Sequence, residues 1–438
     1  MPIRRWSRTG RALALVVGAA ILTAGCKAAR QPAQSPTGPG PIPQAGSLAA
    51  PRSLQQGGVP AEATLAAIPA SNPQTPEKIS LGEKLFFEGR LSQDGTVACS
   101  TCHDPAKAFT DGRPLATGIK GRVGQRNSPT ILNALYNKFQ FWDGRAATLE
   151  DQAMLPIQNP FEMGQPSLEA AVDAVARAPE YRQAFQKVFG RAPNGPDLAR
   201  AIASYERTQF AFGSPFDHFM AGDKNAISDS AKRGWELFNS KARCNLCHAV
   251  SDTKRDPTFF MDQDVHNIGV GIIRHDVVAL ACQAEAKLNS GDTIAVDQAA
   301  ITSNLSVLGR FLVTKKQADI AAFKTPSLRN VLITSPYFHD GSQRTLWDVM
   351  DHYNKGDGVK NPWLDQDIQP LGLSETEIDD VVAFMASLTS PQYRDQGETE
   401  LARQREIART SRTQRDTARA FGPKPVQPNP TLACARAH

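Results

Sequence analysis

Four of the seven cysteines fall into two identical patterns, Cys99-Ser-Thr-Cys102-His103 and Cys244-Asn-Leu-Cys247-His248. Two thiols three positions apart on one helical turn are spaced to add to the two vinyl groups of one porphyrin. The histidine that follows then reaches the iron from one face. The two motifs therefore predict two covalently bound haem c groups, with His103 and His248 as their iron ligands.

Two other chemistries use closely spaced cysteines, and neither fits as well. A structural zinc site requires four nitrogen or sulfur ligands, whereas each motif supplies only a Cys2His set locally. A thioredoxin-like redox pair would gain nothing from a histidine that follows both motifs. Two further cysteines, Cys282 and Cys434, stay open between a disulfide, free thiols and no role.

The N-terminus has the features of an export signal. Residues 1–25 hold four arginines, a short apolar stretch and small residues at the exit, which is typical of a signal peptide. The junction Leu22-Thr-Ala-Gly-Cys26 is similar to a lipoprotein cleavage box in which Cys26 becomes the acylated N-terminus; the alternative is an ordinary signal with a chance cysteine. We expect a periplasmic, membrane-anchored protein, with residues 26–74 as a flexible tether rich in Pro, Ala and Gln.

The positive charge is concentrated at the two ends of the chain. The formal net charge is +5, residues 1–25 supply four arginines and no acid, and the tail from Arg394 holds nine basic and five acidic residues. The body between them is close to neutral, which argues against nucleic-acid binding. We expect the basic tail, residues 394–438, to be disordered or partly helical.

Helical periodicity dominates the body of the chain, and strand patterns are few and short. It is clear over residues 166–188, 194–210, 346–353 and 374–388, the last with Ser374 as N-cap and Glu377 three residues later. The stretches Gly82-Glu-Lys-Leu85-Phe86 and Gly234-Trp-Glu-Leu237-Phe238 precede the two haem motifs as a weak internal repeat. We therefore predict a mainly α fold of two cytochrome c-like haem domains packed against each other, over residues 75–212 and 228–393. Residues 275–297 are expected to be an inserted loop.

Several further stretches resemble the bacterial di-haem cytochrome c peroxidase family, including its MauG-like branch. They are Ala108-Phe-Thr-Asp-Gly112, Arg126-Asn-Ser-Pro-Thr130, Gln140-Phe-Trp-Asp-Gly-Arg145, Asn159-Pro-Phe-Glu-Met-Gly164, His266-Asn-Ile-Gly269, Phe323-Lys-Thr-Pro-Ser-Leu-Arg-Asn330 and Pro336-Tyr-Phe-His-Asp-Gly341. The resemblance implies that the N-terminal haem has an open position for peroxide, and that the C-terminal haem stores and relays electrons.

Four residues match positions around the reacting haem of that family. Glu162, twenty residues after Trp142, matches the carboxylate that would move a proton between the peroxide oxygens. Gln152 and Pro156 match a polar contact and an apolar wall of the same pocket. Trp142 is similar to the tryptophan between the two porphyrins, where an oxidisable indole shortens the electron path.

Two positions distinguish the branches of the family. Many members carry a histidine in the loop before Arg126 that blocks the first iron, whereas residues 117–124 here contain none and place Ile119 or Lys120 at that point. The resemblance therefore implies an iron that is open without reductive activation. For the second iron, the register points to Tyr353 as the distal ligand, as in MauG-like proteins, with Met350 and His352 as alternatives.

The family also binds calcium between its haem domains, and Asn127, Thr334 and Pro336 match the positions that hold it. Calcium takes six to eight oxygen ligands, so water would complete the shell.

Three functions follow from these features. The first is reduction of hydrogen peroxide to water, with electrons from a small cytochrome c or cupredoxin. The second keeps the same irons but oxidises a partner protein through a high-valent di-haem state, as MauG does. The third is a two-haem electron carrier without enzymatic activity.

Overall fold

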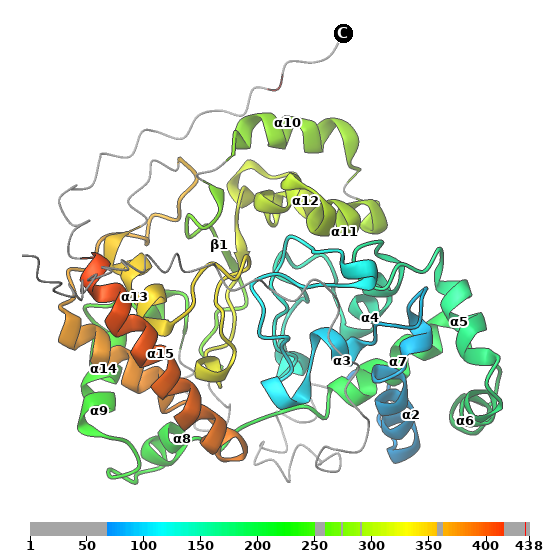
Figure 1. Ribbon diagram of the computed structural model, residues 1–438, viewed down its shortest axis with the longest axis horizontal. Coiled ribbons are helices and arrows are strands. Elements are labelled where there is room, and N and C mark those ends of the chain that lie inside the picture. The colour runs from blue at the N-terminus through cyan, green and yellow to red at the C-terminus, as the bar shows by residue number, and fades with distance from the viewer. Residues whose placement is uncertain are drawn as a thin grey trace, which may run out of the picture. The chain divides into compact units, whose positions relative to one another are not determined.

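The computed structural model describes residues 68–249, 259–272, 275–289, 291–356, 362–415 and Cys434. The predicted signal peptide, Cys26 and the tether up to residue 67 lie outside the described residues. The helices and strands run in this order (Figure 1): α2 Pro76–Phe86, α3 Cys99–Cys102, α4 Leu149–Gln158, α5 Leu168–Ala176, α6 Pro179–Phe189, α7 Gly195–Glu206, α8 Pro215–Met220, α9 Asp229–Phe238, β1 Val265–His266, α10 Val277–Lys287, α11 Thr293–Thr302, α12 Phe311–Thr314, β2 Phe323–Lys324, α13 Leu346–Lys355, α14 Glu375–Ala386 and α15 Arg394–Arg415. The predicted mainly α fold is confirmed.

The core of the first half forms where α2 crosses α7. A Cβ atom built on Gly82 of α2 would lie 1.9 Å from the backbone oxygen of Ala201 of α7, so only glycine allows this close approach. Leu85 and Phe86 of α2 are fully buried there, and the Phe86 ring packs against Tyr205 of α7 with 5.1 Å between ring centroids. The core at this crossing supports the first haem motif, because Cys99 packs against it.

The second half repeats the crossing with α9 and α14. A Cβ atom on Gly234 would lie 1.9 Å from the backbone oxygen of Asp380, and Phe238 and Phe384 pack edge to face at 5.0 Å. Ser374 caps α14 in a box with Glu377, as its sequence predicts. The repeat seen in the sequence therefore marks the first helix of two equivalent crossings, because α2 and α9 each precede a haem motif.

One predicted helix is two helices. The periodic stretch 166–188 breaks at Ala178, and α6 restarts with Pro179, which has no N–H to continue the ladder of α5. The other three predicted helices correspond to α7, α13 and α14.

The prediction of an inserted loop over residues 275–297 is wrong, because α10 and the first half of α11 occupy this stretch. Asp276 and Asp292 cap the two helices, each with a carboxylate that accepts a backbone N–H. Their small apolar residues, among them Ala281, Ala284 and Ala300, are fully buried in a third core shared with α12. Short, weakly amphipathic helices of this kind carry little sequence periodicity, which is why they resemble a loop.

The C-terminal tail is helical through Arg415, which is one of the two forms expected for it. Gln404 of α15 is fully buried, donates to the Tyr337 hydroxyl at 2.7 Å and accepts from the Leu346 amide at 2.8 Å. A disulfide joins Cys434 to Cys282 of α10, which decides among the open alternatives for these cysteines. No helix in the described ranges is long and apolar enough to cross a membrane.

Candidate functional site

The first haem motif lies on a single helical turn. Cys99 and Cys102 form the ends of α3 and stay free thiols, as thioether attachment requires. The ring nitrogen Nδ1 of His103 lies 3.1 Å from the backbone oxygen of Phe109, which adopts a left-handed φ of 59°. Donation from Nδ1 to this carbonyl fixes the tautomer and leaves Nε2 to bind a metal.

The second motif repeats this arrangement on a 3-10 turn that begins at Cys244. Nδ1 of His248 lies 2.7 Å from the backbone oxygen of Phe260, whose φ is 55°. Burial lowers the pKa of both histidines, which favours the neutral imidazole that ligates iron. Both motifs thus present the chemical groups that a haem c needs.

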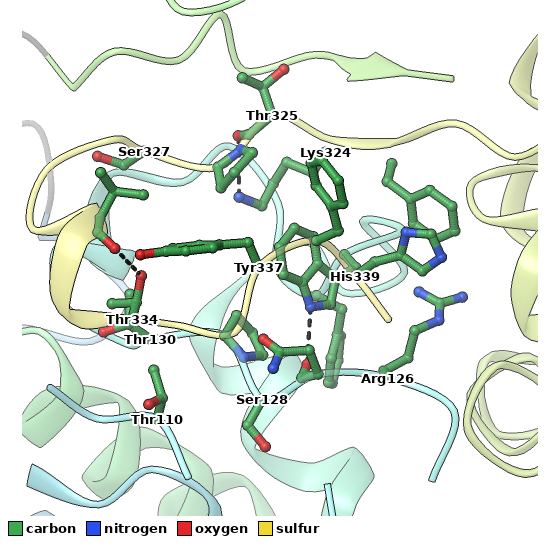
Figure 2. Close-up of a pocket in the computed structure, with 18 of the residues that line it drawn as sticks. Thr110, Arg126, Ser128, Thr130, Lys324, Thr325, Ser327, Thr334, Tyr337 and His339 are labelled. Atoms are coloured by element: carbon green, nitrogen blue, oxygen red, sulfur yellow. Dashed lines mark hydrogen bonds between the residues drawn. The ribbon is translucent and has the colours of Figure 1, made fainter. Parts of the chain in front are cut away.

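One cavity brings the predicted residues together. The residues that line it include all of the following predicted positions: Cys99, Cys102, His103, Asn127, Trp142, Gln152, Pro156, Glu162, Cys244, Cys247, His248, Thr334, Pro336, Met350 and Tyr353. Figure 2 shows a part of its wall, where Arg126 of the first half lies with Lys324, Tyr337 and His339 of the second. The donor set of two thiol pairs and two neutral imidazoles on a shared cavity fits two haem c groups.

On the side of the first motif, α4 and the turn after it form the wall. Gln152 and Pro156 lie on α4, and Glu162 follows on the turn. The Oε2 atom of Glu162 is buried and has no hydrogen-bond partner among the described residues. Burial raises the pKa of Glu162 to about 8, the charge of Asp297 adds to this rise, and Arg145 opposes it. A buried carboxyl without a partner is suited to exchange a proton with a bound molecule.

Trp142 is held by both halves of the molecule. Its indole Nε1 donates to the backbone oxygen of Asn127 at 3.0 Å, and its own backbone oxygen accepts from the Lys324 amide of β2 at 2.7 Å. Lys324 in turn pairs with Val265 in the antiparallel strand pair β1 and β2. Trp142 also lines the cavity that both haem motifs share. The indole is therefore fixed at the boundary between the two halves, and its role between two porphyrins stays a prediction.

The three residues considered as the second iron's distal ligand differ in their surroundings. Tyr353 and Met350 of α13 both line the cavity, and burial raises the pKa of the Tyr353 hydroxyl. Nε2 of His352 lies 2.8 Å from the backbone oxygen of Ile268, so this nitrogen is engaged elsewhere. The arrangement leaves Tyr353 and Met350 as the two candidates on the cavity wall.

The loop over residues 117–124 supplies no nitrogen ligand from its central residues. Ile119 is fully buried and its amide donates to the Glu162 backbone oxygen at 2.9 Å, whereas Lys120 is exposed. Gly118 lies so close to this turn that a Cβ atom would meet the Phe161 oxygen at 2.1 Å. The loop therefore packs on the backbone that carries Glu162.

The three predicted calcium positions lie on the same cavity wall, and Figure 2 shows Thr334 there. The side-chain nitrogen Nδ2 of Asn127 donates to the Arg113 backbone oxygen at 2.8 Å. This bond engages the nitrogen of the Asn127 amide, so the oxygen Oδ1 is the side-chain atom that could bind a cation.

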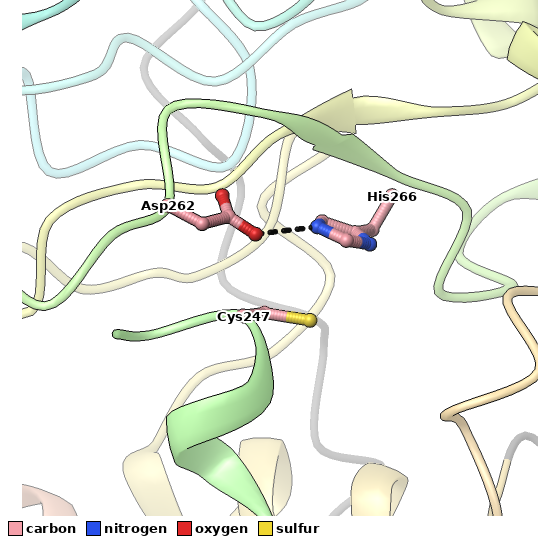
Figure 3. Close-up of side chains that lie close together, drawn as sticks. All are labelled: Cys247, Asp262 and His266. Atoms are coloured by element: carbon pink, nitrogen blue, oxygen red, sulfur yellow. Dashed lines mark hydrogen bonds and ion pairs between the residues drawn. The ribbon is translucent and has the colours of Figure 1, made fainter. Parts of the chain in front are cut away.

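A second cluster beside the second motif looks like a metal site but fits another role better (Figure 3). His266 lies 2.7 Å from Asp262 and 2.6 Å from Asp365, and Cys247 is adjacent. The two carboxylates raise the pKa of His266 to about 12, so the group is an ion triad with a charged imidazolium. A metal here would also consume the Cys247 thiol that haem attachment needs.

Sequence reasoning missed the buried charges behind the first pocket. Arg145 donates to Asp143 at 3.0 Å and to Asp297 at 2.8 Å, and Arg126 lies 3.6 Å from Asp143. Asp297 belongs to α11, in the stretch expected to be a loop. A single carboxylate in a weakly periodic segment gives no signal of burial, so the sequence could not have identified it.

The comparisons with known proteins agree with this geometry. A family model for di-haem cytochrome c peroxidase matches residues 76–225. The methylamine utilization protein MauG of Methylophilus methylotrophus is 38% identical over 325 residues, which cover 73% of this chain and 84% of that protein. Cytochrome-c peroxidase IdrP1 of Pseudomonas sp. strain SCT is 37% identical over 327 residues, 74% of this chain and 83% of that protein.

A solved structure shares the fold. The crystal structure of a MauG-like protein associated with microbial copper homeostasis superimposes with a TM-score of 0.60 at 27% identity, over 74% of this chain and 92% of that chain. Together with the two haem motifs on one cavity, these similarities show that the chain belongs to the di-haem cytochrome c peroxidase family.

Proposed function

We propose that the protein reduces hydrogen peroxide to water at the haem of Cys99, Cys102 and His103. Electrons would come from a small cytochrome c or cupredoxin through the haem of Cys244, Cys247 and His248. The observation that carries the proposal is the buried, unpartnered Oε2 of Glu162 on the wall of the haem cavity. Relatives named cytochrome c peroxidase support the same activity.

When bound, the first haem would supply an iron that binds and polarises peroxide. The ionised Glu162 carboxylate would accept a proton from one peroxide oxygen and return it to the other, while two electrons from the donor protein and two protons from solvent would complete the reduction to two waters. The Gln152 amide lies on the same wall and offers a hydrogen bond to the bound oxygens, whereas the Pro156 ring offers only an apolar surface. Trp142 stands at the boundary of the halves as the path for electrons.

The remaining assignments complete the proposal. Residues 75–212 form the peroxidatic haem domain and residues 228–393 the electron-transfer domain, with His248 and Tyr353 as the two ligands of its iron. Calcium binds at Asn127, Thr334 and Pro336. The signal peptide exports the chain to the periplasm, and a lipid on Cys26 anchors it to the membrane.

Peroxide consumption by the purified protein with both haems attached tests the activity, with a reduced small cytochrome as electron donor. We expect Glu162→Gln to slow turnover about 100-fold or more, because it removes the proton acceptor but keeps the side-chain shape. The matched control is Glu169→Gln, since Glu169 is exposed on α5. Equal rates for Glu162→Gln and the unchanged protein would contradict the role of Glu162.

Oxidation of a partner protein is the second candidate function, and Tyr353 on the cavity wall favours it. A phenolate ligand is anionic and stabilises oxidised iron, so oxidising equivalents could be held for a slow protein substrate. A peroxide-oxidised state that persists without donor, and that Tyr353→Phe shortens, would support this function over simple peroxide reduction.

A further inference from the structure

The geometry points to Asp297 as a positioning residue for Glu162: the α10 and α11 insertion of the second half completes the peroxide pocket of the first. This inference rests on the proposed function, because it concerns the group that handles the peroxide proton. Asp297 of the second half bonds to two residues of the first half, Arg145 before α4 and Asn159 directly after it.

Asp297 is 2% exposed and bridges two side chains of the first half. Its Oδ1 accepts from Nε of Arg145 at 2.8 Å, and its Oδ2 accepts from Nδ2 of Asn159 at 2.7 Å. Both carboxylate oxygens are thus used, each by a buried partner. A buried charge with two fitted donors fixes the positions of those donors, since moving either one leaves the charge unpaired.

Asn159 connects Asp297 to the turn that carries Glu162. The Glu162 amide donates to the Asn159 backbone oxygen at 3.1 Å, and the Phe161 amide donates to Asn159 Oδ1 at 3.0 Å. The Asn159 side chain therefore holds the turn with its oxygen and Asp297 with its nitrogen. The carboxylate on α11 sets the orientation of the turn from which Glu162 reaches the cavity.

The end of α11 and the segment after it support the loop on the other side of Glu162. The Gln125 amide donates to the Ile301 backbone oxygen at 3.0 Å, and Arg126 donates to the hydroxyl and the backbone oxygen of Ser306 at 2.6 and 2.7 Å. Ile301 also lines the haem cavity, with its Cγ2 atom 3.2 Å from where a Cβ atom of Gly124 would lie. The segment with α11 therefore forms part of the wall of the haem cavity.

The charges around Glu162 predict how its titration responds to Asp297. The Asp297 carboxylate raises the pKa of Glu162, whereas Arg145 lowers it. Arg145 also forms an ion pair with Asp143, and Asp143 in turn lies close to Arg126. The loop packed against the turn carries two exposed cations, Lys120 and Arg122. Arg122 donates to the Pro160 backbone oxygen at 2.7 Å. Removal of the Asp297 charge removes its repulsion of the Glu162 carboxylate. The positive charge of Arg145 is then less neutralised and attracts Glu162 more strongly. Both effects lower the pKa of Glu162.

Cyanide binding to the ferric protein tests this inference without catalytic turnover. Hydrogen cyanide must lose a proton to a base in the pocket when it binds, so the rate of binding should follow the ionisation of Glu162. In a plot of the cyanide-binding rate against pH, the rate rises as Glu162 ionises. We expect Asp297→Asn to shift this rising limb to lower pH by about one unit. The matched control is Asp292→Asn on the same helix, because Asp292 is exposed and asparagine caps a helix as well as aspartate does. This control should move the limb by no more than about 0.2 units.

Three outcomes overturn the inference. The first is an Asp297→Asn limb that coincides with that of Asp292→Asn. The second is a lower melting temperature with an unmoved limb, which would mean that Asp297 only holds the fold together. The third is a shift of the same size in the double variant with Glu162→Gln, because a residue that acts through Glu162 has no effect once that carboxylate is gone.

A second variant and a comparison with peroxide consumption complete the experiment. If Asp297→Asn does not attach both haems, Asp297→Ser carries the same prediction, since its smaller side chain admits a water between Arg145 and Asn159. A shifted cyanide limb in a protein that does not consume peroxide would contradict the proposed function while supporting the role of Asp297. An active protein with an unmoved limb would do the reverse.

Discussion

The two haem regions share a helix cap and carry different residues at a matched position on the cavity wall. Thr148 caps α4 in the first half and Thr345 caps α13 in the second, and each accepts the backbone N–H of the third residue that follows. The eighth residue after the cap is Pro156 in the first half and Tyr353 in the second. Both residues line the haem cavity. A proline ring has no atom that can bind iron, whereas a phenol oxygen can. Under the proposed function, this pair of residues would leave the first iron open and close the second.

The parts that stay the same in both halves are those that attach haem. Left-handed Phe109 and Phe260 aim their carbonyls at the Nδ1 atoms of His103 and His248. Attachment therefore requires the same geometry twice, while the opposite face of each haem site is free to differ. The proposed function depends on that difference.

The sharpest way to break the comparison is Pro156→Tyr, which gives the first half the residue of the second. We expect peroxide turnover to fall about 100-fold or more, because a phenol at this position would fill the open place on the iron. Pro156→Ala is the control and should keep turnover within about tenfold, since alanine also leaves the place open. Peroxide assays of the two variants, at equal haem content, check the prediction, and equal rates would contradict it.

The converse change is Tyr353→Phe, which removes the oxygen from the second half. We expect the ferric protein to bind about two cyanides instead of about one, with a second high-spin signal in its electron paramagnetic resonance spectrum. Met350→Leu serves as the comparison variant. If Met350→Leu opens the second iron and Tyr353→Phe does not, the thioether is the ligand.

A smaller effect concerns pH and only the first half. Burial and the Asp297 charge raise the pKa of Glu162 to about 8. Because the ionised form accepts the peroxide proton, turnover should rise with pH up to about 8 and fall about tenfold per unit below it. A pH profile of turnover in the unchanged protein measures this limb. A profile that is flat between about pH 6 and about pH 8 would show that a different group accepts the proton.

The smallest effect should be equal in the two halves. Gly82→Ala and Gly234→Ala each force a methyl group against a backbone oxygen at a helix crossing, so each should lower the free energy of unfolding by about 3 kcal/mol. Thermal unfolding of the two variants measures the loss. A large loss in one half alone would show that the two crossings do not share the same close packing.

The sequence predicted the attachment chemistry well, because a C-x-x-C-H motif encodes its function in five adjacent residues. Through a resemblance that spans both halves, it also picked out Glu162, Gln152, Pro156 and Trp142, and all four line the cavity that the haem motifs share. The buried partner Asp297 could not be found this way, since it comes from a segment with little periodicity and bonds to Asn159 across a separation of 138 residues. Contacts of that kind depend on tertiary packing that no local pattern records.

The central claim is that one iron is open and the other is closed. The electron paramagnetic resonance spectrum of the resting ferric protein, with both haems attached, measures this directly. The account predicts one high-spin signal, which cyanide converts, and one low-spin signal, which cyanide leaves unchanged. Two low-spin signals that are both insensitive to cyanide would contradict it.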